Sequence, residues 1–238
     1  MAIVLLHGFT GSPVSFRPVQ ARLAHPSTAP TLPGHDGTPP PTDLDDALEA
    51  IRDQAGPKPF HLAGYSLGGR LALHYGLRYP EDVSALTIFG ARPGIRTAGE
   101  RLERLESDRQ LASVLRHQGL EAFLGVWEAL PLLQPKTLDR LAVAESKAIR
   151  RRHDASGLAG ALETLSVAAL PDLWPHLRDL PCNPMWVFGE ADAVYRPLMR
   201  QASEIIGNLE SIGGAGHAVV TDAPERVAQL LSRAPFPS

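Results

Sequence analysis

Gly64-Tyr65-Ser66-Leu67-Gly68 is the stretch that decides the fold of this 238-residue chain. The apolar run 60–63 before it is typical of a buried strand, and residues 69–77 after it are typical of a helix. A serine between the two must turn sharply, and glycines on both sides give the backbone room to do so. We therefore expect Ser66 at a strained turn, with its hydroxyl exposed and the backbone N–H of Leu67 facing the same space.

Strand-like and helix-like segments alternate on both sides of this turn. Apolar runs predict strands at 2–6, 28–32, 60–63, 82–90, 185–188 and 209–212, and helical spacing predicts helices at 14–24, 43–54, 69–77 and 225–231. Such alternation favours a mostly parallel sheet with helices on both faces. We predict an α/β fold with a sheet of about six strands.

The alternation is interrupted in the middle of the chain. From residue 99 to residue 170 only helical periodicity remains, and many of the chain's arginines lie there. We predict that residues 1–93 and 176–238 form the α/β core, and that residues 94–175 form a helical cap inserted into it.

Composition limits the classes of function. Hydrophobic residues make up 44% of the chain, which is enough for a sizeable core. The net charge is −3, so no strong electrostatic field favours nucleic acid or an anionic membrane surface. No apolar run approaches the length of a membrane span, and the apolar start of the chain is too short for a signal peptide. The single cysteine, Cys182, excludes an intrachain disulfide. We expect a cytoplasmic monomer.

Cofactor motifs are missing from the sequence. There is no zinc-ligand spacing, no phosphate-binding Walker loop, and no Gly-x-Gly-x-x-Gly after an expected strand. We therefore expect neither a cofactor nor a metal, and a small molecule as the partner.

Ser66 needs a neighbour that takes its proton, because a free serine hydroxyl is a poor nucleophile or base. The usual partner is a histidine that a carboxylate orients. His217 lies on a glycine-rich loop after the last expected strand, and Asp192 follows the strand at 185–188. Since parallel strands end at one edge of a sheet, both should approach Ser66. We predict a catalytic Ser66–His217–Asp192 triad, with Glu190 as the competing acid.

Other polar side chains after Ser66 have simpler expected roles. The surroundings of His74, His117, His153 and His176 suggest surface residues. Asp222 is placed to cap the last helix.

The turn His7-Gly8-Phe9-Thr10-Gly11 follows the first expected strand. A turn at this place can supply a backbone N–H to an oxyanion hole, here from Phe9, beside the N–H of Leu67. Losing one such donor costs on the order of 3 kcal/mol of transition-state stabilisation. We expect His7 to form hydrogen bonds within the loop.

Four motifs together resemble the α/β-hydrolase superfamily. They are Leu6-His7-Gly8-Phe9, Leu32-Pro33-Gly34-His35, the glycine-flanked serine at 64–70, and Gly214-Ala215-Gly216-His217. They occur in the order of that family and span nearly the whole chain. The resemblance implies an α/β-hydrolase fold with the triad in the order Ser, Asp, His.

One branch of the superfamily matches better than the others. Residues 64–70, together with 104–108, 123–127 and 157–163 of the insertion, resemble the 2-succinyl-6-hydroxy-2,4-cyclohexadiene-1-carboxylate synthases. These lyases eliminate pyruvate in menaquinone biosynthesis. The resemblance implies that the triad acts as a base, which removes a proton from a succinyl-cyclohexene polycarboxylate and needs no acyl-enzyme.

A polycarboxylate substrate needs arginines near the serine, because a guanidinium group binds a carboxylate with two parallel hydrogen bonds. Arg70 lies one helical turn past the serine, and Arg104 and Arg150 lie on the insertion. Tyr65 and Trp127 match family positions. Simpler alternatives stay open: Arg70 as a surface residue, either aromatic ring as part of the core, and Arg151 or Arg152 in place of Arg150.

The chain also departs from the synthase pattern. It begins directly at the strand that precedes the oxyanion turn, so we expect a truncated N-terminal edge of the sheet. After Asp192 the sequence is Ala193-Val194-Tyr195, where the synthases often have lysine and then phenylalanine. These departures do not touch the triad, but they leave the substrate open.

Two other functions compete with the lyase. The first is a serine hydrolase of the same fold, a carboxylesterase or a carbon–carbon bond hydrolase that acts on a small acid. The second is a non-catalytic binding module on a hydrolase fold. A neutral ester would not need Arg70 and Arg104, and a binding module would not need an intact triad.

Overall fold

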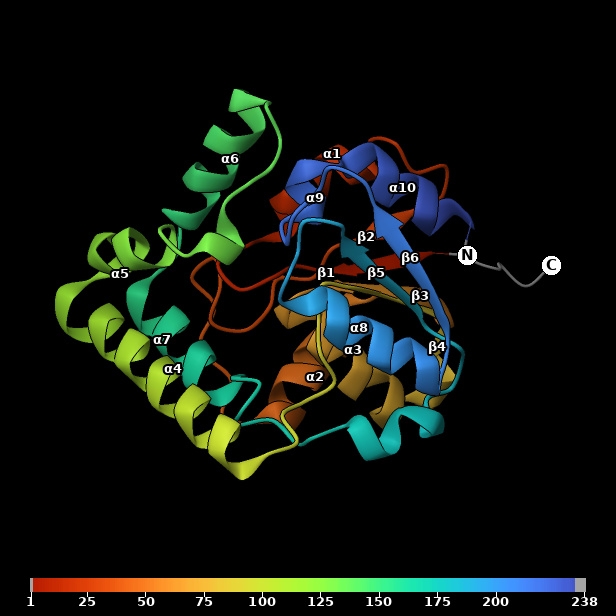
Figure 1. The fold of residues 1–238 in the computed structure, drawn as a ribbon, viewed down its shortest axis with the longest axis horizontal. Coiled ribbons are helices and arrows are strands. Elements are labelled where there is room, and N and C mark those ends of the chain that lie inside the picture. The colour runs from red at the N-terminus through yellow and green to blue at the C-terminus, as the bar shows by residue number, and fades with distance from the viewer. Residues whose placement is uncertain (1, 234–238) are drawn as a thin grey trace.

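A parallel sheet of six strands, in the order β2-β1-β3-β4-β5-β6, forms the centre of the computed structural model, which describes residues 2–233 (Figure 1). The strands are β1 (Ile3–Leu6), β2 (Ser27–Thr28), β3 (Phe60–Tyr65), β4 (Val83–Phe89), β5 (Met185–Gly189) and β6 (Asn208–Ile212). The core helices are α1 (Arg17–Gln20), α2 (Leu44–Gln54), α3 (Leu67–Arg78), α8 (Tyr195–Ile205), α9 (Val219–Asp222) and α10 (Pro224–Arg233). The predicted α/β fold with about six strands is confirmed.

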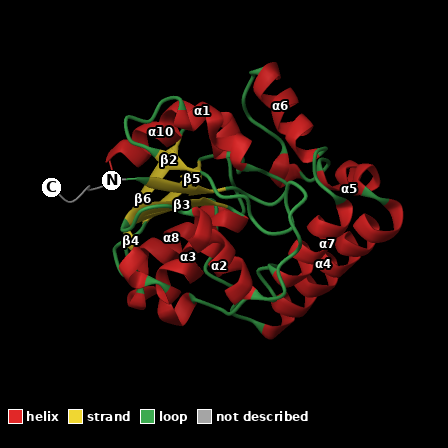
Figure 2. Ribbon diagram, turned by 180° about the vertical axis from the view of Figure 1, so that it is seen from behind, coloured by secondary structure: helices red, strands yellow, loops and turns green. Residues whose placement is uncertain are grey.

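Helices cover both faces of this sheet because its strands are apolar on both faces. Ile3 and Leu5 of β1 pack in a cluster with α1 and α10, whereas Val4 and Leu6 pack in a second cluster with α2, α3 and α8. Figure 2 shows these two helical layers on opposite sides of the sheet. Among residues 2–233, no helix is both long enough and apolar enough to cross a membrane.

The least regular part of the core is its N-terminal third. The strand expected at 28–32 is reduced to Ser27–Thr28, because Pro30 and Pro33 lack the N–H that a sheet ladder requires. The helix expected at 14–24 is a 3-10 turn over Pro13–Phe16 followed by the short α1. The helix expected from residue 43 is present, and Asp43 caps it by accepting from the N–H of Asp46.

Four further helices gather beyond the carboxyl ends of the strands (Figure 1). They are α4 (Ala98–Gln118), α5 (Leu120–Trp127), α6 (Arg140–Arg150) and α7 (Ala155–Thr164). A hydrophobic cluster of their own joins α4, α5 and α7, with Leu115, Phe123 and Leu158 fully buried in it. We call these four helices the cap helices.

The cap helix α7 packs closely against the core. A methyl group added at Gly34 of the core would lie 2.5 Å from the carbonyl oxygen of Gly157 in α7. Beside this contact, His153 donates from Nε2 to the carbonyl oxygen of Thr10 at 3.0 Å. The turn that contains Phe9 is therefore bonded directly to the cap.

Candidate active site

Ser66 lies at the junction of β3 and α3 in a conformation that side chains rarely adopt, with φ at 54° and ψ at −110°. The two flanking glycines are required by their surroundings. A methyl group on Gly64 would lie 2.2 Å from the carbonyl oxygen of Gly68, and one on Gly68 would lie 2.2 Å from that of Leu6. The backbone strain is thus held by close packing, as is typical of functional sites.

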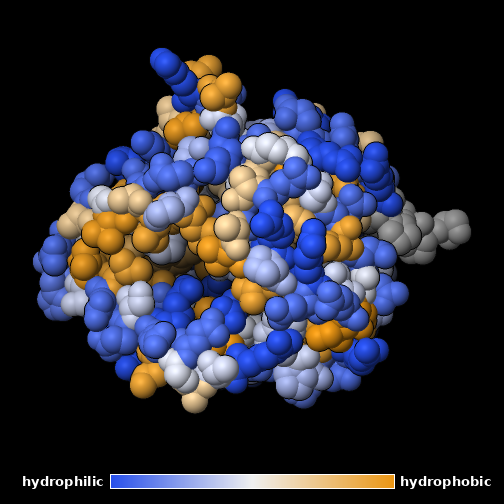
Figure 3. Space-filling view, viewed as in Figure 1, coloured by the Kyte–Doolittle hydropathy of each residue, from blue (hydrophilic) through white to orange (hydrophobic). Residues whose placement is uncertain are grey.

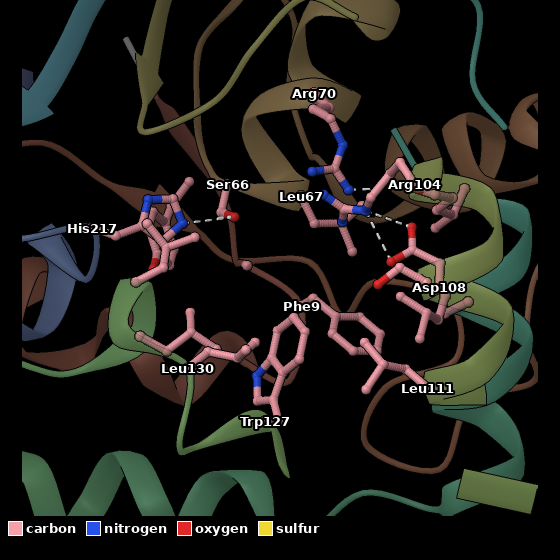
Figure 4. A pocket seen from close by; sticks show the side chains of 18 of the residues that line it. Phe9, Ser66, Leu67, Arg70, Arg104, Asp108, Leu111, Trp127, Leu130 and His217 are labelled. Atoms are coloured by element: carbon pink, nitrogen blue, oxygen red, sulfur yellow. Dashed lines mark hydrogen bonds and ion pairs between the residues drawn. The ribbon is translucent and has the colours of Figure 1, made fainter. Parts of the chain in front are cut away.

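Ser66, His217 and Asp192 form a continuous hydrogen-bonded chain. The Nε2 atom of His217 lies 3.1 Å from the hydroxyl oxygen of Ser66 (Figure 4), and its Nδ1 atom lies 2.8 Å from Asp192 Oδ2. Both His217 and Asp192 are 2% exposed. With the ring proton on Nδ1, the carboxylate accepts from the imidazole, and Nε2 can accept the serine proton.

The loops after β5 and β6 fix the two partners of Ser66. The second carboxylate oxygen of Asp192 accepts from the backbone N–H of Val194 at 3.1 Å and of Tyr195 at 2.9 Å. The ring of Tyr195 stacks on His217 with 4.6 Å between the ring centroids. Glu190, the competing acid, instead accepts from the hydroxyl of Ser211. The carboxylate that reaches His217 is therefore that of Asp192.

The backbone N–H groups of Phe9 and Leu67 belong to residues that line one cavity with Ser66. Among residues 2–233, neither N–H donates a hydrogen bond to another protein group. The turn around Phe9 is closed by a hydrogen bond from the N–H of Gly11 to the oxygen of Gly8, and Thr10 has a positive φ of 62°. Two free donors near a serine are the arrangement that an oxyanion hole requires.

His7 stabilises this turn through hydrogen bonds of its ring. Its Nδ1 lies 2.9 Å from the oxygen of Gly8, and its Nε2 accepts from the N–H of Leu32 at 3.2 Å. Burial lowers the pKa of His7 to about 4, so the ring is neutral. The prediction of hydrogen bonds within the loop is confirmed, with a further bond to residue 32.

The cavity in front of Ser66 has a volume of about 210 Å³ and two different walls. Figure 3 shows a hollow beside the cap helices with hydrophobic residues on one side and hydrophilic residues on the other. In the close-up, Arg70, Arg104 and Asp108 lie on one side of Ser66, and Trp127 and Leu130 lie across the cavity (Figure 4). The cavity therefore suits a molecule with both charged and apolar parts.

Arg70 is the unusual charge of this cavity. It is 8% exposed, and its Nη2 donates to the carbonyl oxygen of Leu165 at 3.2 Å. Its Nε has no hydrogen-bond partner, and among residues 2–233 it forms no ion pair with a carboxylate. Burial lowers the pKa of Arg70 to about 10, which leaves the group charged at neutral pH. A buried cation without a counterion is costly and favours an anionic ligand.

Arg104 approaches the same cavity from the cap helix α4. Its Nε donates to both carboxylate oxygens of Asp108, each at 2.9 Å. Burial alone would lower the pKa of Arg104, but attraction to Asp108 and contact with Tyr195 leave it raised. Arg70 and Arg104 therefore both line the cavity of Ser66, and they come from two separate parts of the chain.

Tyr65 and Trp127 also line this cavity. Burial raises the pKa of Tyr65, whose ring lies 5.3 Å from that of His217. Trp127 packs edge-to-face against Phe9 with 5.3 Å between ring centroids, and its indole N–H is buried without a partner. An unpaired indole N–H is a second donor that an oxygen-bearing ligand could satisfy.

Arg150 is not brought into the cavity with Ser66. Its Nη1 lies 3.3 Å from Glu128 Oε1, and the two side chains are 15% and 17% exposed. Arg151 shares the same carboxylate. Arg150 lines a smaller neighbouring cavity of about 60 Å³, which shares Tyr65 and Trp127 with the cavity of Ser66. The reason is that the half-buried Glu128 attracts the arginine away from the serine.

The roles expected for three other polar side chains, those of His74, His153 and Asp222, were wrong. His74 is buried on α3, and His153 is buried in the turn between α6 and α7, where it contacts Thr10 and Asp36 of the core. His117 and His176 are exposed as expected. Asp222 lies at the end of α9 and accepts from the N–H groups of Gly216, Lys136 and Thr137, so it joins the loop of His217 to the cap.

Two lining residues, Asp108 and Tyr195, were not predicted as part of the site. The four-residue spacing from Arg104 to Asp108 predicts an ion pair on a helix, and this signal was available in the sequence. The role of Tyr195 depends on the loop after Asp192, which no local pattern specifies. Among residues 2–233, no three His, Cys, Asp or Glu side chains are grouped as metal ligands.

Comparison with known families agrees with this fold. The model of the alpha/beta hydrolase family matches residues 3–230, and the chain belongs to this family. Within it, the chain is related to the 2-succinyl-6-hydroxy-2,4-cyclohexadiene-1-carboxylate synthases. The synthase from Enterobacter sp. (strain 638) is 31% identical over 242 residues, which cover 97% of this chain and 90% of that protein.

Solved structures agree on the fold. The structure of MenH from S. aureus matches with a TM-score of 0.88 and 23% identity, over 97% of this chain and 91% of that one. A thermophilic esterase from Thermogutta terrifontis matches with a TM-score of 0.76 and 21% identity, over 97% and 88% of the two chains. One fold thus carries proteins with different names, and the choice of reaction must come from the cavity.

Proposed function

We propose that this protein is a lyase that eliminates pyruvate from a succinyl-cyclohexene polycarboxylate in menaquinone biosynthesis. The observation that carries the proposal is Arg70, a buried guanidinium group in the cavity that Ser66 lines, with no ion pair to a carboxylate among residues 2–233. Arg104 adds a second guanidinium group whose terminal nitrogens bind no carboxylate among the described residues. A substrate with several carboxylates would supply the missing anions.

In this proposal the triad removes a proton. Asp192 holds the ring of His217 in the tautomer with the proton on Nδ1, and Nε2 accepts the proton of Ser66. The serine oxygen then takes a proton from the substrate. The strained turn holds Ser66 exposed at the cavity, and this proton transfer needs no covalent bond between the serine oxygen and the substrate.

The product name of the synthases indicates which proton leaves. In that product the succinyl group sits on a ring carbon of the diene, so this carbon has lost its hydrogen. Removing that hydrogen creates an enolate on the succinyl carbonyl, which the N–H groups of Phe9 and Leu67 can stabilise. The electron pair then moves through the ring, and the carbon–oxygen bond breaks. The leaving group departs as the enolate of pyruvate, which becomes pyruvate by taking the proton that His217 accepted from Ser66.

The remaining lining residues would orient the ring. Tyr65 and Trp127 offer aromatic surface beside the serine, and the unpaired indole N–H of Trp127 can donate to an oxygen of the substrate. Arg150 could take part only if it left Glu128, which now holds it.

The decisive experiment measures pyruvate. Purified protein is incubated with the succinyl-cyclohexene precursor, and released pyruvate is followed with a coupled dehydrogenase assay. We expect saturable release that Ser66→Ala abolishes. The alternative function is a serine hydrolase; background levels of pyruvate together with rapid cleavage of p-nitrophenyl esters would favour it over the lyase.

We further propose the chain's organisation and setting. Residues 94–175 act as a cap on a core formed by residues 1–93 and 176–238, which is supported by the separate hydrophobic cluster of α4, α5 and α7. One chain supplies every side chain of the proposed site, which supports a functional monomer, and a single cysteine is consistent with the cytoplasm. Size-exclusion chromatography with light scattering tests the oligomeric state.

A further inference from the structure

Two adjacent residues just past the end of α7 hold both arginines of the cavity. The carbonyl oxygen of Leu165 accepts from Arg70 Nη2 at 3.2 Å. The hydroxyl of Ser166 donates to Asp108 Oδ2 at 2.6 Å, and Asp108 in turn binds Arg104. One guanidinium group from the core helix α3 and one from the cap helix α4 are therefore tied to the same point of the chain.

Asp108 binds Arg104 through a single nitrogen of the guanidinium group, Nε. A carboxylate commonly pairs with two nitrogens of a guanidinium group. Here both oxygens of Asp108 contact only Nε, each at 2.9 Å. The two terminal nitrogens, which carry four of the five N–H donors, bind no carboxylate among residues 2–233. The contact with Asp108 therefore orients Arg104 without occupying its terminal nitrogens, and the side chain of Tyr195 is a second, neutral partner of the guanidinium group.

Ser166 fixes the orientation of Asp108. Its hydroxyl oxygen accepts from the N–H of Ala168 at 3.0 Å, so the hydroxyl proton is directed at Asp108. Ser166 is 1% exposed and Asp108 is 3% exposed. Water cannot easily replace the serine at such a buried position, and loss of the hydroxyl would leave a carboxylate oxygen with only Arg104 as partner.

We infer that Asp108 and Ser166 are positioning residues, which aim the terminal nitrogens of Arg104 at one carboxylate of the substrate. Leu165 does the same for Arg70 through its backbone, so the pair Leu165-Ser166 sets the spacing between two carboxylate-binding groups. Figure 4 shows the side chains of Arg70 and Arg104 next to each other beside Leu67, with the carboxylate of Asp108 at the side of Arg104. This inference rests on the proposed function and predicts a preference for substrates with two carboxylates.

Ser166→Ala is the sharpest test, because it removes one hydroxyl and no charge. We expect the KM for the succinyl-cyclohexene precursor to rise about tenfold, as for loss of one charge-assisted hydrogen bond, with kcat nearly unchanged. Asp108→Asn should raise KM further. The matched control is Ser113→Ala, an exposed serine of α4 whose hydroxyl pairs with His117, and it should leave both constants unchanged.

A double-mutant cycle separates positioning from general damage to the fold. If Ser166 acts through Arg104, then Ser166→Ala should add no further loss in a protein that already carries Arg104→Ala. Independent, additive losses would overturn the inference. If Ser166→Ala does not fold, Asp108→Asn enters the same cycle, with thermal melting of every variant as the check.

Binding without turnover keeps the inference distinct from the proposed function. Calorimetry with succinate as a probe dicarboxylate should show weaker binding in Ser166→Ala, and no difference between Arg104→Ala and the double variant. Absence of pyruvate release by the wild type would reject the proposed function, while the succinate titrations would still decide the positioning role. Normal pyruvate release with unchanged KM and unchanged succinate binding in Ser166→Ala would reject the positioning role alone.

Discussion

The two walls of the cavity are built by different physical means. The core wall, with Ser66 and His217, follows the carboxyl ends of strands and is fixed by backbone contacts so close that glycine is required at positions 64 and 68. The cap wall, with Arg104 and Trp127, is fixed by side-chain contacts: Arg104 pairs with Asp108 within α4, and Trp127 packs against Phe9. Backbone packing holds a reacting atom tightly, whereas side-chain pairs can be exchanged to suit a ligand.

The largest effect should come from the reacting atoms of the core wall. Ser66→Ala and His217→Ala should each lower the rate of pyruvate release by about 10⁴-fold, because members of a triad act as one unit. For the same reason the double variant should be no slower than either single variant. Initial rates and a circular dichroism spectrum of each variant check this, and rates that fall in two independent steps would contradict a shared role.

The next largest effect is on the free energy of unfolding, because the backbone is packed more tightly around Ser66 than in the cap helices. Gly68→Ala should lower the free energy of unfolding by about 3 kcal/mol or more, because the added methyl group would lie 2.2 Å from the oxygen of Leu6. Gly125→Ala on the cap helix α5, where a methyl group meets nothing within 4 Å, should raise it by about 0.5–1 kcal/mol. Urea denaturation measures both, and equal effects would remove the contrast.

The arginines test whether each wall contributes to binding. Arg70→Ala from the core and Arg104→Ala from the cap should each lower kcat/KM for the polycarboxylate by at least about tenfold, since each removes a charge-assisted pair of hydrogen bonds. Arg109→Ala, an exposed arginine of the same helix as Arg104, is the matched control and should have no effect. Unchanged values for Arg70→Ala, with ester cleavage retained, would count against the lyase.

The smallest effect concerns the contact between cap and core. Burial lowers the pKa of His153 below its ordinary value of 6.5, although its contacts with Thr10 and Asp36 oppose the shift. The unfolded chain therefore binds this proton more readily than the folded protein. The stability contributed by a neutral His153 is complete above pH 6.5 and is lost as the pH falls below that value.

Melting temperatures between pH 7 and pH 5 check this. The decline with falling pH should be shallower in His153→Gln than in the wild type, whereas the exposed His117→Gln on α4 should follow the wild type. Parallel curves for all three proteins would show that His153 is not a source of the pH dependence.

Most of the core was predictable because each strand and helix there carries its own local signal. Apolar runs identified the strands, and glycines around Ser66 identified the turn. The prediction failed where prolines shorten an element, as in the reduced strand β2. It also failed for burial of single histidines, since His74 and His153 are buried by elements that lie far away in the sequence.

The sequence by itself determined the α/β alternation, the place of Ser66 between a strand and a helix, and the chain order of Asp192 and His217, because these follow from local apolar patterns and glycine positions. Only the tertiary structure decided which charges meet at the cavity. It left Arg70 buried without a counterion, tied Arg104 through Asp108 to Ser166, and drew Arg150 away to Glu128. These outcomes depend on distances between helices that are far apart in the chain, and no local pattern encodes such distances.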